Sequence, residues 1–74
     1  MTKIYTSKLC AHCVSLKSFL SSFSIPFLEV DISENTKARD EIVGKGFRKM
    51  PVLQVGDEFI SGTELEEVKR LLHI

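Results

Sequence analysis

Two cysteines separated by two residues are the feature of this chain that could carry chemistry. They are the only cysteines among 74 residues and lie in the run Cys10-Ala11-His12-Cys13, after a β-type segment and at the start of a helical one. Two thiols so placed can close into a disulfide and reopen with little backbone movement. The attacking species in that exchange is a thiolate, and the free N–H groups and dipole of a helix start lower a thiol pKa. The spacing therefore predicts a redox dithiol.

The same two thiols could instead bind a metal. A zinc site needs about four ligands, and two cysteines with two histidines supply no second paired cluster. Haem attachment needs a histidine directly after the second cysteine, where this chain has Val14. A Cu(I) or iron–sulfur carrier stays open as an alternative because soft thiolates suit Cu(I), although small copper chaperones typically carry Met where Lys8 stands. A redox-inert interaction module is the other alternative.

Composition narrows the partners and the compartment. Ten acidic and ten basic residues cancel, which gives no reason to expect nucleic acid or a membrane surface as partner. No apolar run approaches the roughly 20 residues that span a bilayer, and the N-terminus lacks the zones of a signal peptide. We expect one small soluble domain over residues 1–74, monomeric and cytoplasmic, where a lone C-x-x-C favours catalysis or metal binding over a structural disulfide.

Hydrophobic periodicity and turn residues predict seven elements in the order βαβαββα. The predicted strands are 2–6, 27–32, 50–55 and 58–60, and the predicted helices are 14–23, a second capped by Ser33 and ending near 43, and a third after the capping box Thr63-Glu64-Leu65-Glu66. A strand–helix–strand unit is normally parallel and right-handed. Two such units and a hairpin at Gly56-Asp57 predict an α/β fold with a four-stranded mixed sheet flanked by helices.

The apolar stripe of each helix predicts which side chains are buried. In the first helix it predicts that Cys13 faces inward while Cys10, three residues earlier at the helix mouth, is exposed. The side chains expected to be buried are Cys13, Leu16, Leu20 and Phe23 in the first helix and Leu65, Val68, Leu71 and Leu72 in the last.

This order, with C-x-x-C at the first helix, Met50-Pro51 at the third strand and Gly62 before the last helix, resembles the glutaredoxin branch of the thioredoxin fold over essentially the whole chain. The short length and the stretch 46–52 look most like NrdH-type redoxins, small glutaredoxin-like proteins that reduce ribonucleotide reductase with electrons from thioredoxin reductase. Glutaredoxins usually have Gly-Gly and a following Asp, which bind glutathione, where this chain has Ser61-Gly62 and Thr63-Glu64. Glutathione and thioredoxin reductase, each supplied by NADPH, both remain candidate donors.

The resemblance implies a role for each site residue. Cys10 attacks a disulfide of a protein substrate, possibly ribonucleotide reductase, or a glutathione mixed disulfide, and Cys13 resolves the intermediate. The dithiol itself carries two electrons, so no bound cofactor and no metal are expected. In this family Pro51 is cis and faces the dithiol, which leaves the backbone of Met50 free to pair with an extended substrate. Ser61, Gly62 and Thr63 shape the substrate surface.

Charged residues near the dithiol are the remaining candidates. Lys8 and His12 would favour the Cys10 thiolate by charge or by hydrogen bonding. Arg48, within a basic cluster with Lys45 and Lys49, would attract acidic tails or glutathione carboxylates. For Lys8 and for the basic cluster the alternative is an ordinary solvated loop.

Overall fold

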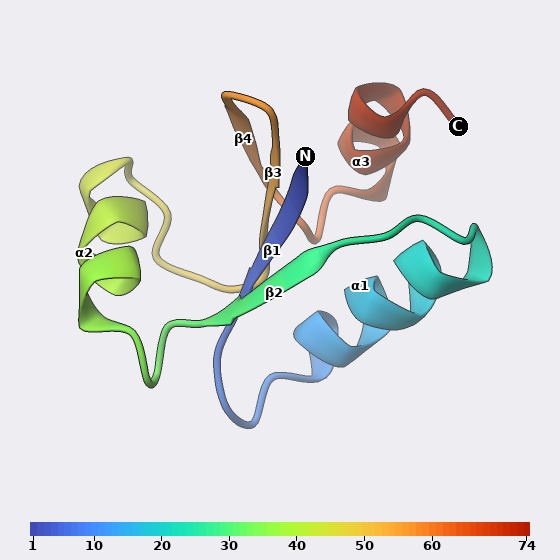
Figure 1. The fold of residues 1–74 in the computed structure, drawn as a ribbon. Coiled ribbons are helices and arrows are strands. Elements are labelled where there is room, and N and C mark those ends of the chain that lie inside the picture. The colour runs from blue at the N-terminus through green and yellow to red at the C-terminus, as the bar shows by residue number, and fades with distance from the viewer.

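The computed structural model describes residues 1–74 and has the predicted elements in the predicted order (Figure 1). The strands are β1 (Thr2–Thr6), β2 (Leu28–Asp31), β3 (Val52–Val55) and β4 (Glu58–Ser61), and the helices are α1 (Ala11–Ser22), α2 (Thr36–Gly44) and α3 (Leu65–Leu72). They form one four-stranded mixed sheet in the order β2-β1-β3-β4. None of the helices combines the length and the apolar character needed to cross a membrane.

The direction of β3 differs from the prediction. The first strand–helix–strand unit is parallel as expected, but β3 pairs antiparallel with β1, so the second unit is not a parallel crossover. Asp31 pairs with Thr6 at the end of β1, and Val52 at the start of β3 pairs with Tyr5 nearby. The connection through α2 therefore leaves and re-enters the sheet at the same end. That helix has nine residues and one buried side chain, Ile42, and it does not return the chain along the sheet.

Helices cover both faces of the sheet, α1 and α3 on one and α2 on the other (Figure 1). Successive strand residues point to opposite faces, so Ile4 of β1 packs in the core under α1 and α3, while Tyr5 packs in the core under α2. The larger core contains Ile4, Leu16, Leu20, Leu53 and Val68, and the smaller one Tyr5, Ile42 and Val52. The sheet and α1 thereby hold the helix start that carries the cysteines.

Ser33 does not cap α2. Its N–H donates to Asp31 Oδ1 at 2.8 Å, an Asx turn, so the chain is still turning at this residue. The N-cap is Asn35, whose Oδ1 accepts the N–H of Ala38 at 3.0 Å. Ser33 Oγ instead accepts the N–H of Lys8 at 3.2 Å and so joins the loop before Cys10 to the loop before α2.

The predicted capping box is also absent. The helix α3 begins at Leu65 with Glu64 at its N-cap, and no side chain caps it. The Thr63 hydroxyl instead lies 2.9 Å from the Ser61 hydroxyl, with which it forms a hydrogen bond.

Two side chains expected in the core are half exposed. Phe23 is 50% exposed because α1 ends at Ser22, and its ring lies 5.0 Å from that of Phe19 at the helix end. Leu65 is 48% exposed in the first turn of α3. Val68 is buried, and Leu71 and Leu72 pack against the larger core, so the apolar stripe of α3 is confirmed apart from its first member.

Candidate active site

The two cysteines lie at the start of α1, which begins three residues earlier than its apolar pattern indicated. Cys10 is the N-cap, and its Sγ accepts the backbone N–H of Cys13 at 3.1 Å. The two cysteines are joined in a disulfide, with their Cα atoms 5.2 Å apart. An N-cap sulfur that accepts a backbone N–H stands where the helix dipole favours negative charge. The local structure thus stabilises a thiolate at Cys10 once the disulfide is reduced.

Burial distinguishes the two sulfurs. Cys13 is 2% exposed, as the apolar stripe predicted. Cys10 is only half-buried rather than fully exposed, because its Sγ lies 3.6 Å from the carbonyl oxygen of Met50. This contact becomes a hydrogen bond only when the sulfur carries a proton as a thiol. A substrate disulfide can therefore reach Cys10 but not Cys13.

Met50 and Pro51 line the site beside Cys10. Their peptide bond is cis, and β3 begins only at Val52, after the proline that has no N–H to donate. No backbone hydrogen bond uses the N–H or the carbonyl of Met50. These groups have the freedom that pairing with an extended substrate segment requires.

Gly62 is packed against both sides of the site. Its N–H donates to the carbonyl oxygen of Pro51 at 2.9 Å. A Cβ at this position would lie 2.6 Å from Leu16 Cδ2 and 2.9 Å from Pro51 Cγ. Its φ is not positive, so a special turn conformation does not explain the glycine. The absence of a side chain lets α1, the proline loop and the loop before α3 meet.

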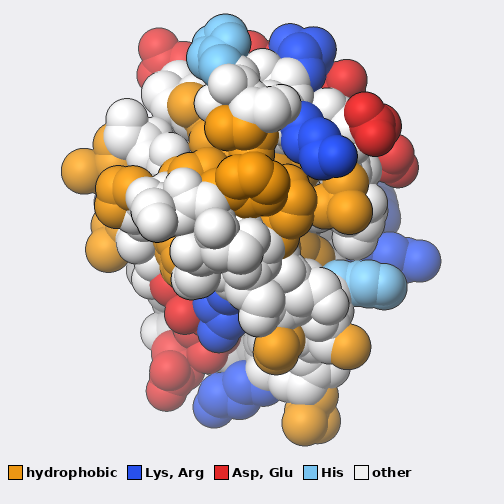
Figure 2. Space-filling model, turned by 90° about the vertical axis from the view of Figure 1, so that its right-hand side faces the viewer, with side chains coloured by type: hydrophobic (Ala, Val, Ile, Leu, Met, Phe, Trp, Pro, Cys, Tyr) orange, Lys and Arg blue, Asp and Glu red, His pale blue; other side chains and the backbone are white.

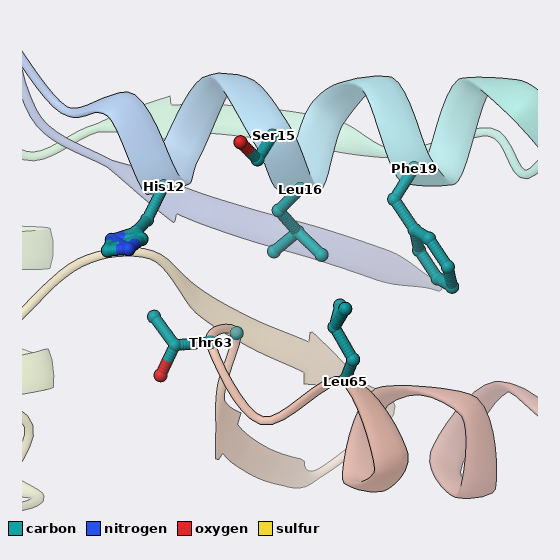
Figure 3. A pocket seen from close by; sticks show the side chains of 7 residues that line it. His12, Ser15, Leu16, Phe19, Thr63 and Leu65 are labelled. Carbon is teal, nitrogen blue, oxygen red and sulfur yellow. The ribbon is translucent and has the colours of Figure 1, made fainter.

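A groove of about 260 Å³ lies between α1 and the start of α3 (Figure 3). His12 and Thr63 point toward one another across it, and Leu16 faces Leu65. The lining residues are His12, Ser15, Leu16, Phe19, Gly62, Thr63 and Leu65. On this side of the molecule Figure 2 shows hydrophobic side chains gathered at the surface. Three of the residues singled out from the sequence, His12, Gly62 and Thr63, thus line one groove.

Three residues that line this groove were not predicted from the sequence: Ser15, Phe19 and Leu65. The available signal was that Phe19 stands beside the buried stripe of its helix rather than in it. For Leu65 the apolar stripe was misleading, because it predicted a buried side chain, whereas Leu65 is 48% exposed.

The two cations proposed for the site are not tied to the sulfurs. Lys8 and Arg48 are exposed, and neither side chain makes an ion pair or hydrogen bond. Lys8 contributes only its backbone N–H, to Ser33. Three other basic residues do pair with carboxylates: Lys17 with Glu29, Arg39 with Asp40, and Arg70 with Glu58 and Glu67. Lys8 and Arg48 are therefore unpaired surface charges.

No group of three or more His, Cys, Asp or Glu side chains is arranged to hold a metal ion. The two sulfurs at the helix start, present here as a disulfide, can carry out thiol–disulfide exchange.

Comparison with known proteins gives a consistent result. The glutaredoxin family model matches residues 2–60. The chain is 31% identical to the glutaredoxin-like protein NrdH of Lactococcus lactis subsp. cremoris over 96% of this chain and 99% of that protein. It is 32% identical to NrdH of Salmonella typhimurium over 92% and 84% of the two chains. Among solved structures, NrdH-redoxin from Escherichia coli superposes with a TM-score of 0.87 at 27% identity, covering 95% of this chain and 92% of that one.

Proposed function

The chain belongs to the glutaredoxin family, and we propose that it reduces protein disulfides through the Cys10–Cys13 dithiol. The observation that carries this proposal is the difference in burial between the two sulfurs. Cys10 is accessible at a helix N-cap, whereas Cys13 is 2% exposed and bonded to Cys10. One sulfur can meet a substrate, and the other can meet only its neighbour.

The catalytic sequence follows from that asymmetry. The Cys10 thiolate attacks one sulfur of the substrate disulfide, and the other substrate sulfur leaves as a thiolate that takes up a proton. Cys13 then loses its proton and attacks Cys10 Sγ in the mixed disulfide, which releases the second substrate thiolate. Two electrons pass to the substrate, and the 10–13 disulfide remains. The Cys13 N–H that donates to Cys10 Sγ at 3.1 Å stabilises the thiolate, and the free backbone of Met50 aligns the substrate.

We propose thioredoxin reductase as the electron donor and ribonucleotide reductase as the first substrate to test. Support comes from the match over nearly the full length of two proteins named NrdH. The sequence Ser61-Gly62-Thr63-Glu64 also departs from the glutathione-binding Gly-Gly and Asp of glutaredoxins. In this proposal the protein works as a monomer in the cytoplasm, a compartment in which thiols are kept reduced.

An NADPH-coupled disulfide reduction assay, run with each donor system, tests the proposal. One run supplies glutathione with glutathione reductase, and the other supplies thioredoxin reductase alone. We expect turnover in the run with thioredoxin reductase and none in the run with glutathione. Turnover only with glutathione would make the protein a glutathione-dependent glutaredoxin and refute the proposed donor. No turnover in either run would refute the disulfide reductase activity itself and would favour the alternative of a Cu(I) or iron–sulfur carrier.

Two serine variants test the roles of the sulfurs. Cys13→Ser should still attack a substrate disulfide but accumulate the mixed disulfide, which mass spectrometry detects as an added mass. Cys10→Ser is the matched control and should form no adduct, because the buried Cys13 cannot reach a substrate. An adduct on Cys13 in that control would contradict the assignment.

A further inference from the structure

The residue directly before the attacking cysteine is the most exposed large apolar side chain of the protein. Leu9 has an exposed fraction of 106%, above Met1 at 86% and Val14 at 60%. A leucine placed fully in water forgoes the stabilisation that burial of its apolar surface would give. Nothing in the chain packs on it, so folding alone does not account for a leucine here.

The backbone at Leu9 is also unusual. Its φ of 55° lies in the left-handed region, which disfavours L-residues and is a genuine outlier for a bulky side chain. The preceding residue is held in place because the N–H of Lys8 donates to Ser33 Oγ at 3.2 Å. At the following residue, Cys10 is fixed as the N-cap of α1. The loop thus holds Leu9 outward, against the backbone preference of leucine.

The position of Leu9 determines what must cover it. Consecutive Cα atoms are about 3.8 Å apart, so Leu9 lies next to the point at which a protein disulfide must approach Cys10 Sγ. Two further apolar residues lie close to Cys10: Ala11, the next residue along the chain, is exposed, and Met50, whose carbonyl oxygen lies 3.6 Å from Cys10 Sγ, is partly exposed. The surface around the accessible sulfur is therefore apolar at Leu9, although the unpaired cation Lys8 directly precedes this residue.

We propose that Leu9 is a specificity-determining contact that selects protein disulfides flanked by apolar side chains. It buries its side chain against the substrate residues next to the attacked cysteine when Cys10 forms the mixed disulfide. The inference rests on the proposed disulfide reductase activity and adds the kind of disulfide on which that activity is used. Small disulfides without flanking side chains should gain nothing from Leu9.

Two cyclic disulfide peptides of the same length provide the test, one with leucine on both sides of each cysteine and one with serine there. The pre-reduced protein is mixed with each peptide, and the second-order rate constant is measured without any reductase. The wild type should prefer the leucine peptide about tenfold, as partial burial of one leucine side chain allows. Leu9→Asn should lower this ratio to about one, because asparagine tolerates the left-handed conformation but removes the apolar contact.

Controls separate recognition from structure. Leu9→Met keeps an apolar side chain and should keep the preference, and Val14→Thr, which changes another exposed apolar residue near the dithiol, should do the same. Leu9→Asn should be at least as stable to urea as the wild type, whereas a structural role for Leu9 would appear as lost stability. An unchanged peptide ratio in Leu9→Asn would overturn the inference.

The wild type also separates this inference from the proposed function. If it reduces 2-hydroxyethyl disulfide and both peptides at equal rates, the activity stands and the role of Leu9 is refuted. If it reduces none of the three, the disulfide reductase activity is refuted as well.

Discussion

Replacing Gly62 by alanine should destabilise the protein and disturb its dithiol at the same time. The new Cβ would lie 2.6 Å from Leu16 Cδ2, 2.9 Å from Pro51 Cγ and 3.2 Å from the Pro51 carbonyl oxygen. The first contact is with a side chain that is 2% exposed within the larger core. The other two contacts are with the proline next to Met50. Neither neighbour can move into open space, so the strain must spread into α1 or into the proline loop.

Overpacking of this kind typically costs about 1–3 kcal/mol of unfolding free energy. A domain of this size is expected to have only about 4–11 kcal/mol in total, so the loss is a large fraction. It corresponds to a rise of roughly 5- to 150-fold in the unfolding equilibrium constant. Because Leu16 lies one turn after Cys13 and Pro51 follows Met50, the rate of disulfide reduction should fall as well.

Urea unfolding followed by circular dichroism measures the stability change, and the coupled assay measures the activity. Gly44→Ala is the matched control, because a Cβ at Gly44 meets nothing within 4 Å. It should stabilise the protein by about 0.4–1 kcal/mol through the lost flexibility of the unfolded chain.

A second background tests the cause of the Gly62→Ala effect. Leu16→Val removes the Cδ2 atom that makes the shortest contact, so the cost of Gly62→Ala should be smaller in that background than in the wild type. If Gly62→Ala is as stable as the wild type, or if Leu16→Val leaves its cost unchanged, the packing argument is wrong.

Two further predictions concern charge. His12→Ala should make the dithiol more reducing, because the variant loses an imidazole that stabilises the Cys10 thiolate, and a shift of about 30 mV would mean a tenfold change in the equilibrium. Redox titration measures the potential, with Ser15→Ala as the control from the same groove. An unchanged potential in His12→Ala would contradict this role of the imidazole. Hydrogen bonds from Arg70, and then its charge, lower the pKa of Glu67, so their contribution to stability is present above the unfolded pKa of Glu67 and is lost as pH falls through its folded pKa. Arg70→Gln should therefore destabilise the protein near pH 7 but not in acid below the folded pKa of Glu67. Urea unfolding at both pH values measures the stability, with Arg39→Gln as the control variant. An equal loss of stability at both pH values would contradict the link to the Glu67 carboxylate.

The sequence was sufficient to predict the elements, their order and the central chemistry. Each of these depends on local information: alternation and helical periodicity mark strands and helices, and a C-x-x-C at a helix start implies a dithiol. The inward direction of Cys13 also followed, because one helical stripe includes it with Leu16 and Leu20. The exact caps did not follow, because the Ser33 hydroxyl accepts the N–H of Lys8 and the Thr63 hydroxyl pairs with that of Ser61, so neither side chain caps α2 or α3.

Tertiary structure decided how distant segments meet. The antiparallel pairing of β3 with β1 depends on which end of the sheet the chain re-enters, and local propensity contains no information about this. The half-burial of Cys10 comes from Met50, forty residues away, and the need for glycine at position 62 comes from Leu16 and Pro51. Side-chain periodicity records which face of an element is buried, but only packing determines what lies against it. For this reason the sequence identified the cysteine pair, while the groove and the full exposure of Leu9 next to Cys10 appeared only in the folded structure.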